Sequence, residues 1–214
     1  RRFLGNLGIN LPTLPLICSV LRTKPMQGPT DIAVGAPNFS FRKHQDGGFI
    51  ITQRGALDAP LTLDHLLIGT RYLQQLRGQR DFLRISFGKY GIKDLGLARK
   101  WTAQDTSPFE KVRMMDPNAN ESLNNEALAN LKAAWPSFSK LEIANTWAGV
   151  IDVTPDSNPV IDSIESISGL TVATGFSGHG FGTSPAAGQL AADLISGHPP
   201  IIDPHPYRFS RFNT

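Results

Sequence analysis

Alternating apolar and polar residues predict β-strands in the first part of the chain. An apolar, β-branched segment at 14–22 favours one strand, and residues 38–44 favour a second. The turn that follows contains Asp46-Gly47, and Asp-Gly between two apolar segments is a strong hairpin signal. Residues 48–53 are therefore predicted to return as the antiparallel partner strand within a meander.

Two later segments carry apolar residues at helical spacing. Leucines recur at this spacing over 62–76, behind a threonine that can serve as N-cap. A second helix is expected at 124–135, where Pro136 stops it. A short strand is predicted at 82–87, and residues 103–120 are loop-like.

The C-terminal part of the chain alternates strands and turns. Residues 138–153 predict a long strand that is interrupted at Gly149, and dense turn chemistry follows at 154–159. A short strand is expected at 160–164. The apolar segment 169–174 is typical of a strand that is buried on both faces.

A glycine-rich loop follows this last strand and leads into a helix with clear end signals. Ser184 is the expected N-cap, Pro185 the first helical residue and Gly197 the C′ residue, with an extended proline-rich tail beyond it. The free N–H groups and positive dipole end of such a helix can bind an anion or a cofactor. The loop residues are Gly175, Phe176, Ser177, Gly178, His179, Gly180, Phe181, Gly182 and Thr183.

Two interpretations of this loop remain open on pattern alone. The loop lacks G-x-G-x-x-G, which argues against the usual dinucleotide fingerprint. Phe176, His179 and Phe181 suit a flat aromatic ring better than a pyrophosphate. The alternative is a tight strand-to-helix turn whose glycines serve packing alone.

Composition narrows the class of protein. The 214 residues are 40% hydrophobic and 18% charged, enough to bury a core, and 20 glycines with 16 prolines argue against an all-helical bundle. No run of 18 apolar residues is present, so no transmembrane segment is predicted. The single cysteine, Cys18, excludes a disulfide scaffold and is interpreted as a small buried hydrophobe.

Charge and histidine content add no further site. The net charge is +3, and the basic residues concentrate between 77 and 100. A solvated face is favoured there, because the neighbouring aromatic residues form no known nucleic-acid motif, so we predict no nucleic-acid partner. The histidines have no spacing that suggests metal ligands, and no metal site is predicted.

Four blocks of sequence, taken together, resemble a known family. They lie at 147–156, 158–161, 169–170 and 175–181. Their order and spacing resemble the C-terminal portion of the FAD-dependent D-amino-acid oxidase family, which includes glycine, sarcosine and D-amino-acid oxidases and dehydrogenases. The resemblance extends over nearly the whole chain and is specific over 147–197.

The resemblance implies an α+β, partly α/β, fold with two domains. Residues 14–165 would form an antiparallel-sheet substrate domain. Residues 166–198 would supply the C-terminal strand, loop and helix of a Rossmann-like FAD-binding domain, whose earlier part would end at 1–13. The N-terminal dinucleotide motif is absent here, so the rest of the FAD module is expected in the same or another chain.

The ends of the chain are interpreted in the same way. Arg1 is taken as the edge of a fragment or a processed chain. Residues 199–214 would run as an extended tail, and within them 208–212 resemble the family's C-terminal Arg-Phe and are expected to hold the tail against the body.

The family also implies a chemistry. The complete protein, of which this chain is a fragment or subunit, would oxidise the C–N bond of an amino acid or amine by hydride transfer to flavin N5, and water would hydrolyse the imine. The loop Gly175–Thr183 is expected to bind FAD non-covalently, because it contains no cysteine. N–H groups of 180–184 would face the flavin edge, with a positive φ anticipated at Gly180.

A non-enzymatic alternative stays open. The chain could be a binding or assembly subunit, or an inactive truncated remnant that keeps the family fold. In that case the basic stretch between 77 and 100 would dock a partner. The expected location is the cytoplasm, with peripheral attachment to a membrane left open.

One position departs from the family pattern. Many members read Ala-Gly-Leu-Arg-Pro where this chain reads 148–152 as Ala-Gly-Val-Ile-Asp. In the family that arginine commonly clamps a substrate carboxylate, which Ile151 cannot do. Arg42 and Arg54 are candidate substitutes, although a surface charge is the favoured interpretation of both. Asp152 could attract an amine cation, but a turn-stabilising role is favoured.

Overall fold

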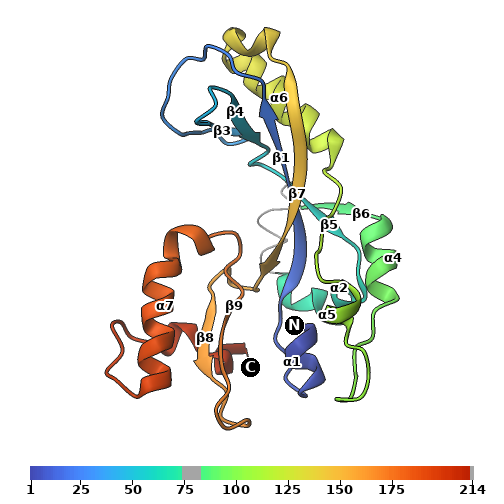
Figure 1. Ribbon diagram of the computed structural model, residues 1–214, viewed down its shortest axis with the longest axis vertical. Helices are drawn as coiled ribbons and strands as arrows, with labels where there is room; N and C mark the ends of the chain where they lie inside the picture. Colours follow the sequence, from blue (N-terminus) through green and yellow to red (C-terminus); the bar gives the residue numbers. More distant parts are fainter. Residues whose placement is uncertain (74–82, 213–214) are drawn as a thin grey trace.

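The computed structural model describes residues 1–73 and 83–212. Within them, a seven-stranded mixed sheet runs from the top of the molecule to its centre, and a two-stranded sheet lies below it beside a long helix (Figure 1). The mixed α+β architecture predicted from the sequence is confirmed. The arrangement places the glycine-rich loop where the lower sheet meets the end of the large one.

Strand β1 (Leu14–Thr23) is the centre of the large sheet. It pairs antiparallel with β7 (Ile143–Val153) along its whole length. Its other edge pairs with β4 (Phe49–Thr52) and with β5 (Leu57–Pro60). β7 passes through Gly149 without the predicted interruption, because Gly149 stays in register opposite Cys18.

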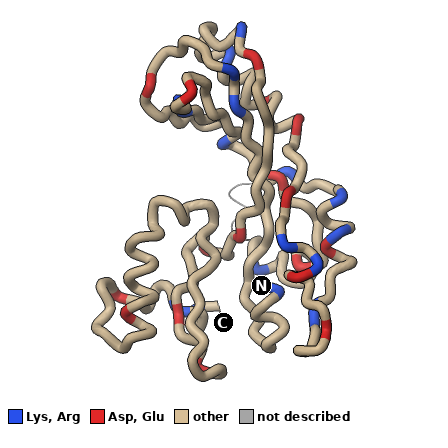
Figure 2. The backbone as a smooth tube through the Cα atoms, viewed as in Figure 1, with Lys and Arg blue, Asp and Glu red and all other residues tan. Residues whose placement is uncertain are grey.

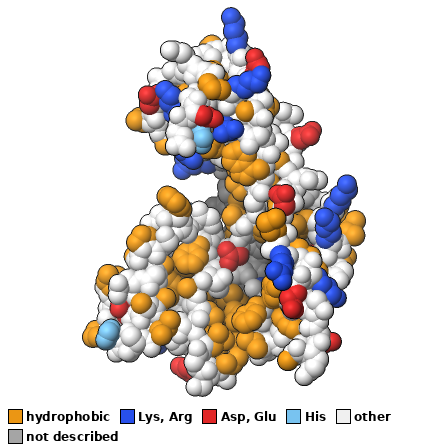
Figure 3. All heavy atoms as spheres, viewed as in Figure 1, with side chains coloured by type: hydrophobic (Ala, Val, Ile, Leu, Met, Phe, Trp, Pro, Cys, Tyr) orange, Lys and Arg blue, Asp and Glu red, His pale blue; other side chains and the backbone are white. Residues whose placement is uncertain are grey.

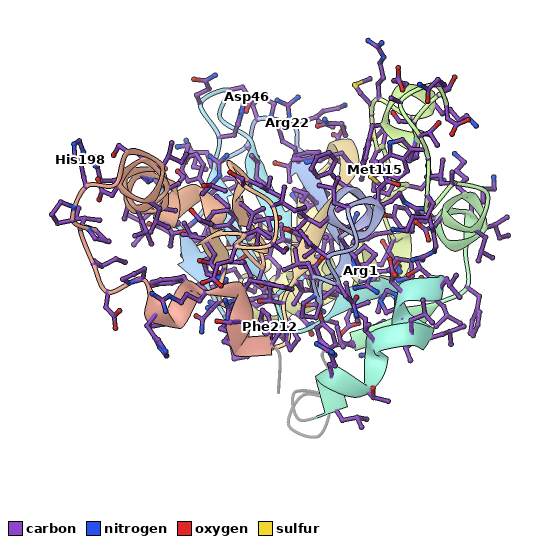
Figure 4. All side chains as sticks on the ribbon, turned by 90° about the horizontal axis from the view of Figure 1, so that it is seen from below. Arg1, Arg22, Asp46, Met115, His198 and Phe212 are labelled. Carbon is purple, nitrogen blue, oxygen red and sulfur yellow. The ribbon has the colours of Figure 1, made fainter. Side chains whose placement is uncertain are left out.

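The predicted hairpin forms at the upper end of this sheet. β3 (Ser40–Lys43) pairs with β4 across a turn in which Gly47 has a φ of +86°. β2 (Val34–Gly35) pairs with β3 on its outer side. Arg22 of β1 reaches the turn and binds Asp46 at 2.9 Å, and the two labelled side chains lie together in Figure 4.

A helical module surrounds the other end of the sheet. β6 (Leu83–Ser86) pairs with β5 in parallel. Around this pair lie α2 (Leu63–Ile68), η1 (Gly69–Tyr72), α4 (Lys89–Leu95) and α5 (Pro108–Lys111).

Two predictions in this module need correction. The helix predicted at 62–76 ends as an α-helix at Ile68, because a glycine, a poor helix former, follows it and the chain tightens into a 3₁₀ turn. Positions 74–76 of that prediction lie outside the described residues. The segment predicted as loop at 103–120 contains α5, which starts at a capping box between Ser107 and Glu110.

Helix α6 (Glu121–Ala134) covers one face of the sheet and closes the main core. It starts before the predicted position because Asn120 caps it, accepting a hydrogen bond from the Leu123 N–H at 3.2 Å. The 3₁₀ helix η2 (Pro136–Lys140) then replaces the start of the strand predicted at 138–153. The buried core residues are Leu21, Phe39, Phe41, Phe49, Ile51, Ala127, Leu128, Leu131 and Phe138.

The lower sheet is an antiparallel hairpin of β8 (Val160–Ser163) and β9 (Thr171–Thr174). Helix α7 (Gly180–Ser196) packs on one side of it, where Leu190 meets Ile161. On the other side Val160 packs with Leu4 of α1 (Arg2–Asn6). Because β8 pairs with β9, the two sheets separate at the turn after β7.

The tail folds back on the body instead of running extended. It forms the 3₁₀ turns η3 (His205–Tyr207) and η4 (Phe209–Phe212). Arg211 Nε binds Asp156 Oδ2 at 2.7 Å, and the Phe209 N–H donates to Asp162 at 2.8 Å. The expected attachment of 208–212 to the body is confirmed, while the extended conformation predicted for the tail is wrong because these contacts bend it.

Charged residues lie unevenly over the fold. Lys and Arg follow the upper sheet and the region of α4, and α7 carries none (Figure 2). Part of the basic stretch is bound within the chain: Arg99 binds Asp64 at 2.8 Å, and Lys100 Nζ donates to the Gly5 carbonyl at 2.6 Å. Residues 77 and 80 of that stretch lie outside the described residues.

Candidate functional site

The loop between β9 and α7 runs through left-handed backbone. Gly175, Ser177 and Gly178 have φ values of +72°, +52° and +85°. Gly175 also needs to be glycine for space, since a Cβ there would lie 2.6 Å from Thr154 Cγ2. The sequence predicted a loop whose glycines adopt positive φ, and Gly175 and Gly178 do so.

The end of β7 holds this loop in place. Asp152 Oδ2 accepts hydrogen bonds from the Gly175 N–H at 2.7 Å and from the Thr174 hydroxyl at 2.9 Å. The Asp152 carbonyl accepts from the Ser177 N–H at 3.0 Å, and the Thr154 N–H donates to Ser177 Oγ at 3.2 Å. These bonds keep Ser177 in a conformation that non-glycine residues rarely adopt. Asp152 therefore has the turn-stabilising role that the sequence favoured.

Helix α7 begins earlier than predicted. Its N-cap is His179 and its first residue is Gly180, so Ser184 is not the N-cap and Pro185 lies inside the helix. A proline in this place cannot donate to the Phe181 carbonyl one turn back. The Ser184 hydroxyl donates to that carbonyl instead, at 3.1 Å, which makes the helix continuous across Pro185.

The first N–H groups of α7 are the ones open to a ligand. In a helix that begins at Gly180, the N–H groups of Gly180, Phe181 and Gly182 have no partner one turn back. The Thr183 N–H donates to the His179 carbonyl at 3.3 Å. Of the groups predicted at 180–184, the first three therefore point out of the helix end, where the dipole is positive.

The glycines at the start of α7 differ in what surrounds them. Gly180 has helical rather than positive φ, so the anticipated left-handed backbone is absent there. A Cβ on Gly180 would meet Phe176 at 3.2 Å, whereas one on Gly182 would meet no described atom within 4 Å. Glycine at 182 is thus not explained by packing against the described part of the chain.

The aromatic residues of the loop separate into different roles. Phe176 packs inward with the cluster around Leu190. Phe181 is fully exposed, and His179 is exposed as well. Only Phe181 and His179 are therefore open to a flat ring at this helix end.

Of the two predicted substrate positions, one lies at the loop. A Cβ at Gly178 would lie 3.7 Å from Ile151 Cδ1, so the Ile151 side chain contacts the loop. Arg42 pairs with Ile50, and Ile50 pairs with Arg22 of β1. Ile151 pairs with Leu16, which lies six residues before Arg22 on the same strand. At about 3.3 Å per residue the two levels are about 20 Å apart. The structure does not place Arg42 beside Ile151.

Sequence reasoning missed Tyr72, which joins the segment before β1 to the end of β7, at one end of the large sheet near the loop. Its hydroxyl lies 2.8 Å from the Pro12 carbonyl and 2.7 Å from the Val153 carbonyl. Burial raises the pKa of this phenol, so it stays a neutral donor shared between the two carbonyls. No local pattern marks a tyrosine that pairs with chain segments so distant in sequence.

Cys18 is half-buried on β1 opposite Gly149, and burial raises the pKa of its thiol. The residue is less buried than its apolar neighbourhood predicted. In the part of the chain that the structure describes, no three His, Cys, Asp or Glu side chains gather at a metal-binding spacing.

Two hollows are lined by no residue of the loop. One, of about 700 Å³, is lined by residues of β5, β6, α4 and the segment 112–118, including Met115. The other, of about 310 Å³, lies near α1 and includes Arg1 and Arg99. Met115 lies well apart from His198, which follows α7, and Arg1 lies nearer the middle of the molecule (Figure 4). None of the described helices combines the length and apolar character needed to cross a membrane.

Comparison with known proteins decides the family. Residues 1–194 match the FAD dependent oxidoreductase (DAO) family. The chain belongs to this family. The structure of L-amino acid deaminase from Proteus vulgaris matches 99% of this FAD-dependent oxidoreductase chain with a TM-score of 0.90 and 30% identity. The chain covers 49% of that protein, so it spans about half of its length.

Two curated relatives match shorter stretches of this family member. FAD-dependent oxidoreductase domain-containing protein 1 of Mus musculus is 34% identical over 111 residues, which are 50% of this chain and 23% of the mouse protein. Glycine oxidase of Pseudomonas aeruginosa is 37% identical over 89 residues, 42% of this chain and 23% of that enzyme. The similar proteins thus include enzymes whose names specify an amino acid, an L-amino acid deaminase and a glycine oxidase.

Proposed function

We propose that the complete protein is an FAD-dependent oxidoreductase that oxidises the C–N bond of an amino acid. Bound FAD would accept hydride at N5, and water would hydrolyse the resulting imine. The similar proteins named above, an L-amino acid deaminase and a glycine oxidase, support amino acids as the substrate class. The cytoplasmic location stays a prediction.

The observation that carries the proposal is the open start of α7. Three N–H groups point out of the positive end of this helix, and residues 175–184 contain no acidic side chain. Such an end stabilises negative charge, which reduced flavin carries near N1 and the C2 oxygen. Gly182 leaves room for a ring edge because no described atom lies within 4 Å of a Cβ there. These residues fit a flavin held non-covalently.

In this proposal the two sheets belong to different functional parts of the protein. Residues 14–165 would contribute most of the substrate domain, and 1–13 with 166–198 would contribute to the FAD module. Gly175, Ser177 and Gly178 would fix the loop. Gly180, Phe181 and Gly182 would donate N–H groups to the flavin, and Ile151 would face the substrate side. The remaining FAD contacts would come from the part of the protein outside this chain.

Gly182→Val in the complete protein tests this assignment. The added side chain meets no described atom, and valine forms helix at least as well as glycine, so the fold should be kept. A flavin edge at this position would clash with it, and we expect FAD affinity to fall by at least about tenfold, equal to about 1.4 kcal/mol. The measurement is an FAD titration of the apoprotein followed by flavin fluorescence.

Gly188→Val is the matched control, on the same helix and also without a described atom within 4 Å. It should bind FAD as the wild type does. Unchanged FAD affinity in Gly182→Val would show that the loop is a packing turn. A complete wild-type protein that stays colourless with added FAD would favour the alternative, a non-catalytic assembly subunit.

A further inference from the structure

A carboxylate at the end of β7 holds the loop that leads to α7. Asp152 Oδ2 lies 2.7 Å from the Gly175 N and 2.9 Å from the Thr174 hydroxyl. We propose that Asp152 is a positioning residue, which fixes the start of α7 relative to the bound flavin. This inference rests on the proposed function and adds a residue for which the sequence favoured only turn stability.

The chemistry of the residue matters because the bonds to the Gly175 N–H and the Thr174 hydroxyl need a side-chain acceptor oxygen at position 152. A hydrogen bond from a backbone N–H to a carboxylate is charge-assisted and roughly twice as strong as one between neutral groups. Gly175 is buried, so its N–H would remain unpaired without this acceptor, and a buried unpaired donor is costly. Asp152 therefore fixes the first residue of the loop.

The fixed residue Gly175 lies close to the start of α7, so it restricts where the helix can begin. Only 176–179 separate Gly175 from the first residue of α7. The second attachment, between the Ser177 N–H and the Asp152 carbonyl at 3.0 Å, uses the backbone of the same residue. Loss of the Asp152 side chain would remove the bonds to Thr174 and Gly175 and leave this backbone bond, so the loop would loosen at its first residue.

The functional consequence is a flavin property and not only stability. A helix N-terminus close to N1 and the C2 oxygen favours the reduced, negatively charged form of flavin. If the helix start moves away, the flavin becomes harder to reduce and its midpoint potential falls. FAD affinity should fall as well, because the same N–H groups contribute to binding.

The test compares three variants of the complete, FAD-loaded protein. Asp152→Ala removes the acceptor, and we expect a lower flavin midpoint potential and about tenfold weaker FAD binding. Asp152→Asn keeps an acceptor oxygen of the same reach but makes only a neutral hydrogen bond, so both values should lie between those of Asp152→Ala and the wild type. Thr174→Val removes one of the two bonds to Oδ2 and should shift the potential in the same direction by a smaller amount.

Asp162→Ala is the matched control. Asp162 Oδ2 also accepts a backbone hydrogen bond, from the Phe209 N–H at 2.8 Å, but it anchors the tail and not the loop. This variant should lose stability and keep the wild-type potential and FAD affinity.

The outcomes separate the two proposals. A wild-type complete protein that binds no FAD overturns both. A wild type that binds FAD, with an Asp152→Ala protein that is less stable but unchanged in potential and affinity, overturns the positioning role alone. An Asp152→Asn protein that shifts as far as Asp152→Ala also overturns it, because the effect would then come from charge. If Asp152→Ala does not fold, the Asn and Thr174→Val variants decide the question.

Discussion

Helices α6 and α7 have similar lengths but very different surroundings. α6, with 14 residues, buries a continuous stripe against the large sheet that includes Leu123, Ala127 and Leu131. α7 has 17 residues, yet only Ala187, Leu190 and Asp193 are buried. Helix α6 is therefore part of a buried core, whereas α7 packs on a small hairpin and leaves most of its own surface exposed.

The open surface of α7 is apolar rather than charged. It carries no Lys or Arg, and its exposed positions include Phe181 and Ile195, the latter 70% exposed. Hydrophobic groups are visible over the lower part of the molecule in Figure 3. Together with the half-length coverage of the Proteus vulgaris structure, this agrees with our proposal that the remaining FAD contacts come from outside this chain. The comparison shows that α6 buries its apolar stripe against the large sheet, whereas most of the α7 surface meets no other described part of the chain.

The same substitution on each helix should break or support this comparison most strongly. Leu131 of α6 and Leu190 of α7 are both fully buried. In this 214-residue chain, Leu131→Ala should cost toward the upper end of about 2–5 kcal/mol in unfolding free energy, since its aromatic-rich surroundings cannot collapse into the cavity. Leu190→Ala should cost toward the lower end, because the thin layer around α7 can relax.

Urea unfolding of both variants, read by tryptophan fluorescence and circular dichroism, measures the two costs. Equal costs would mean that α7 is packed as firmly as α6, and the comparison would fail. Adding FAD and the remainder of the protein should raise the cost of Leu190→Ala and leave that of Leu131→Ala unchanged.

A smaller effect is expected at the joint between the two regions. Gly175→Ala places a Cβ at positive φ and 2.6 Å from Thr154 Cγ2, so it should destabilise the chain by about 1–3 kcal/mol. Gly169→Ala is the control, with a φ of +78° and no described atom within 4 Å. The difference between the two variants isolates the contact with Thr154. Equal unfolding midpoints would show that Thr154 moves aside and that this contact costs nothing measurable.

The sequence predicted the large sheet better than the candidate site. The hairpin at Asp46-Gly47 and the strand at 14–22 depend on local alternation and on one turn, so the pattern was sufficient. Strand β5 and its parallel pairing with β6 depend on partners distant in sequence. No window of residues contains that information, and the pattern predicted no strand at β5.

The start of α7 shows why the site was harder to predict. Ser184 and Pro185 are strong local start signals, yet the helix begins at Gly180. The signals were overridden because the Ser184 hydroxyl replaces the hydrogen bond that Pro185 cannot make, and because Asp152 fixes the loop one strand away. The glycine content was readable from the sequence, whereas the tether from β7 was not. The start of α5, by contrast, carries a capping box at Ser107 and Glu110, which is visible in the sequence, yet the segment was predicted as loop.

The smallest expected effect concerns the tail, whose 3₁₀ turns η3 and η4 pack against β8. Arg211 binds both Asp156 oxygens, at 2.7 Å and 3.2 Å, and donates to the Asn158 carbonyl at 2.8 Å. Partial burial by itself would raise the pKa of Asp156. The hydrogen bonds from Arg211 and from the Asn158 N–H lower this pKa by more than burial raises it, so the net shift is downward. A lowered carboxyl pKa stabilises the folded tail above the ordinary aspartate value of about 3.9. That contribution is lost as the pH falls below this value, through the folded-state pKa.

Hydrogen exchange of the amides at 205–212, expressed as protection factors at each pH, reports on this contact. Protection should be highest near neutral pH and should fall below about pH 4, as the carboxylate is protonated. Arg211→Ala should lower protection at neutral pH and flatten the pH dependence, while the core amides of β1 keep their protection. Arg208→Ala is the control, because that side chain donates no hydrogen bond to a described residue. If Arg211→Ala leaves the protection unchanged, Phe209 and Phe212 hold the tail through apolar packing with Val160 and its neighbours, and the ion pair contributes nothing measurable.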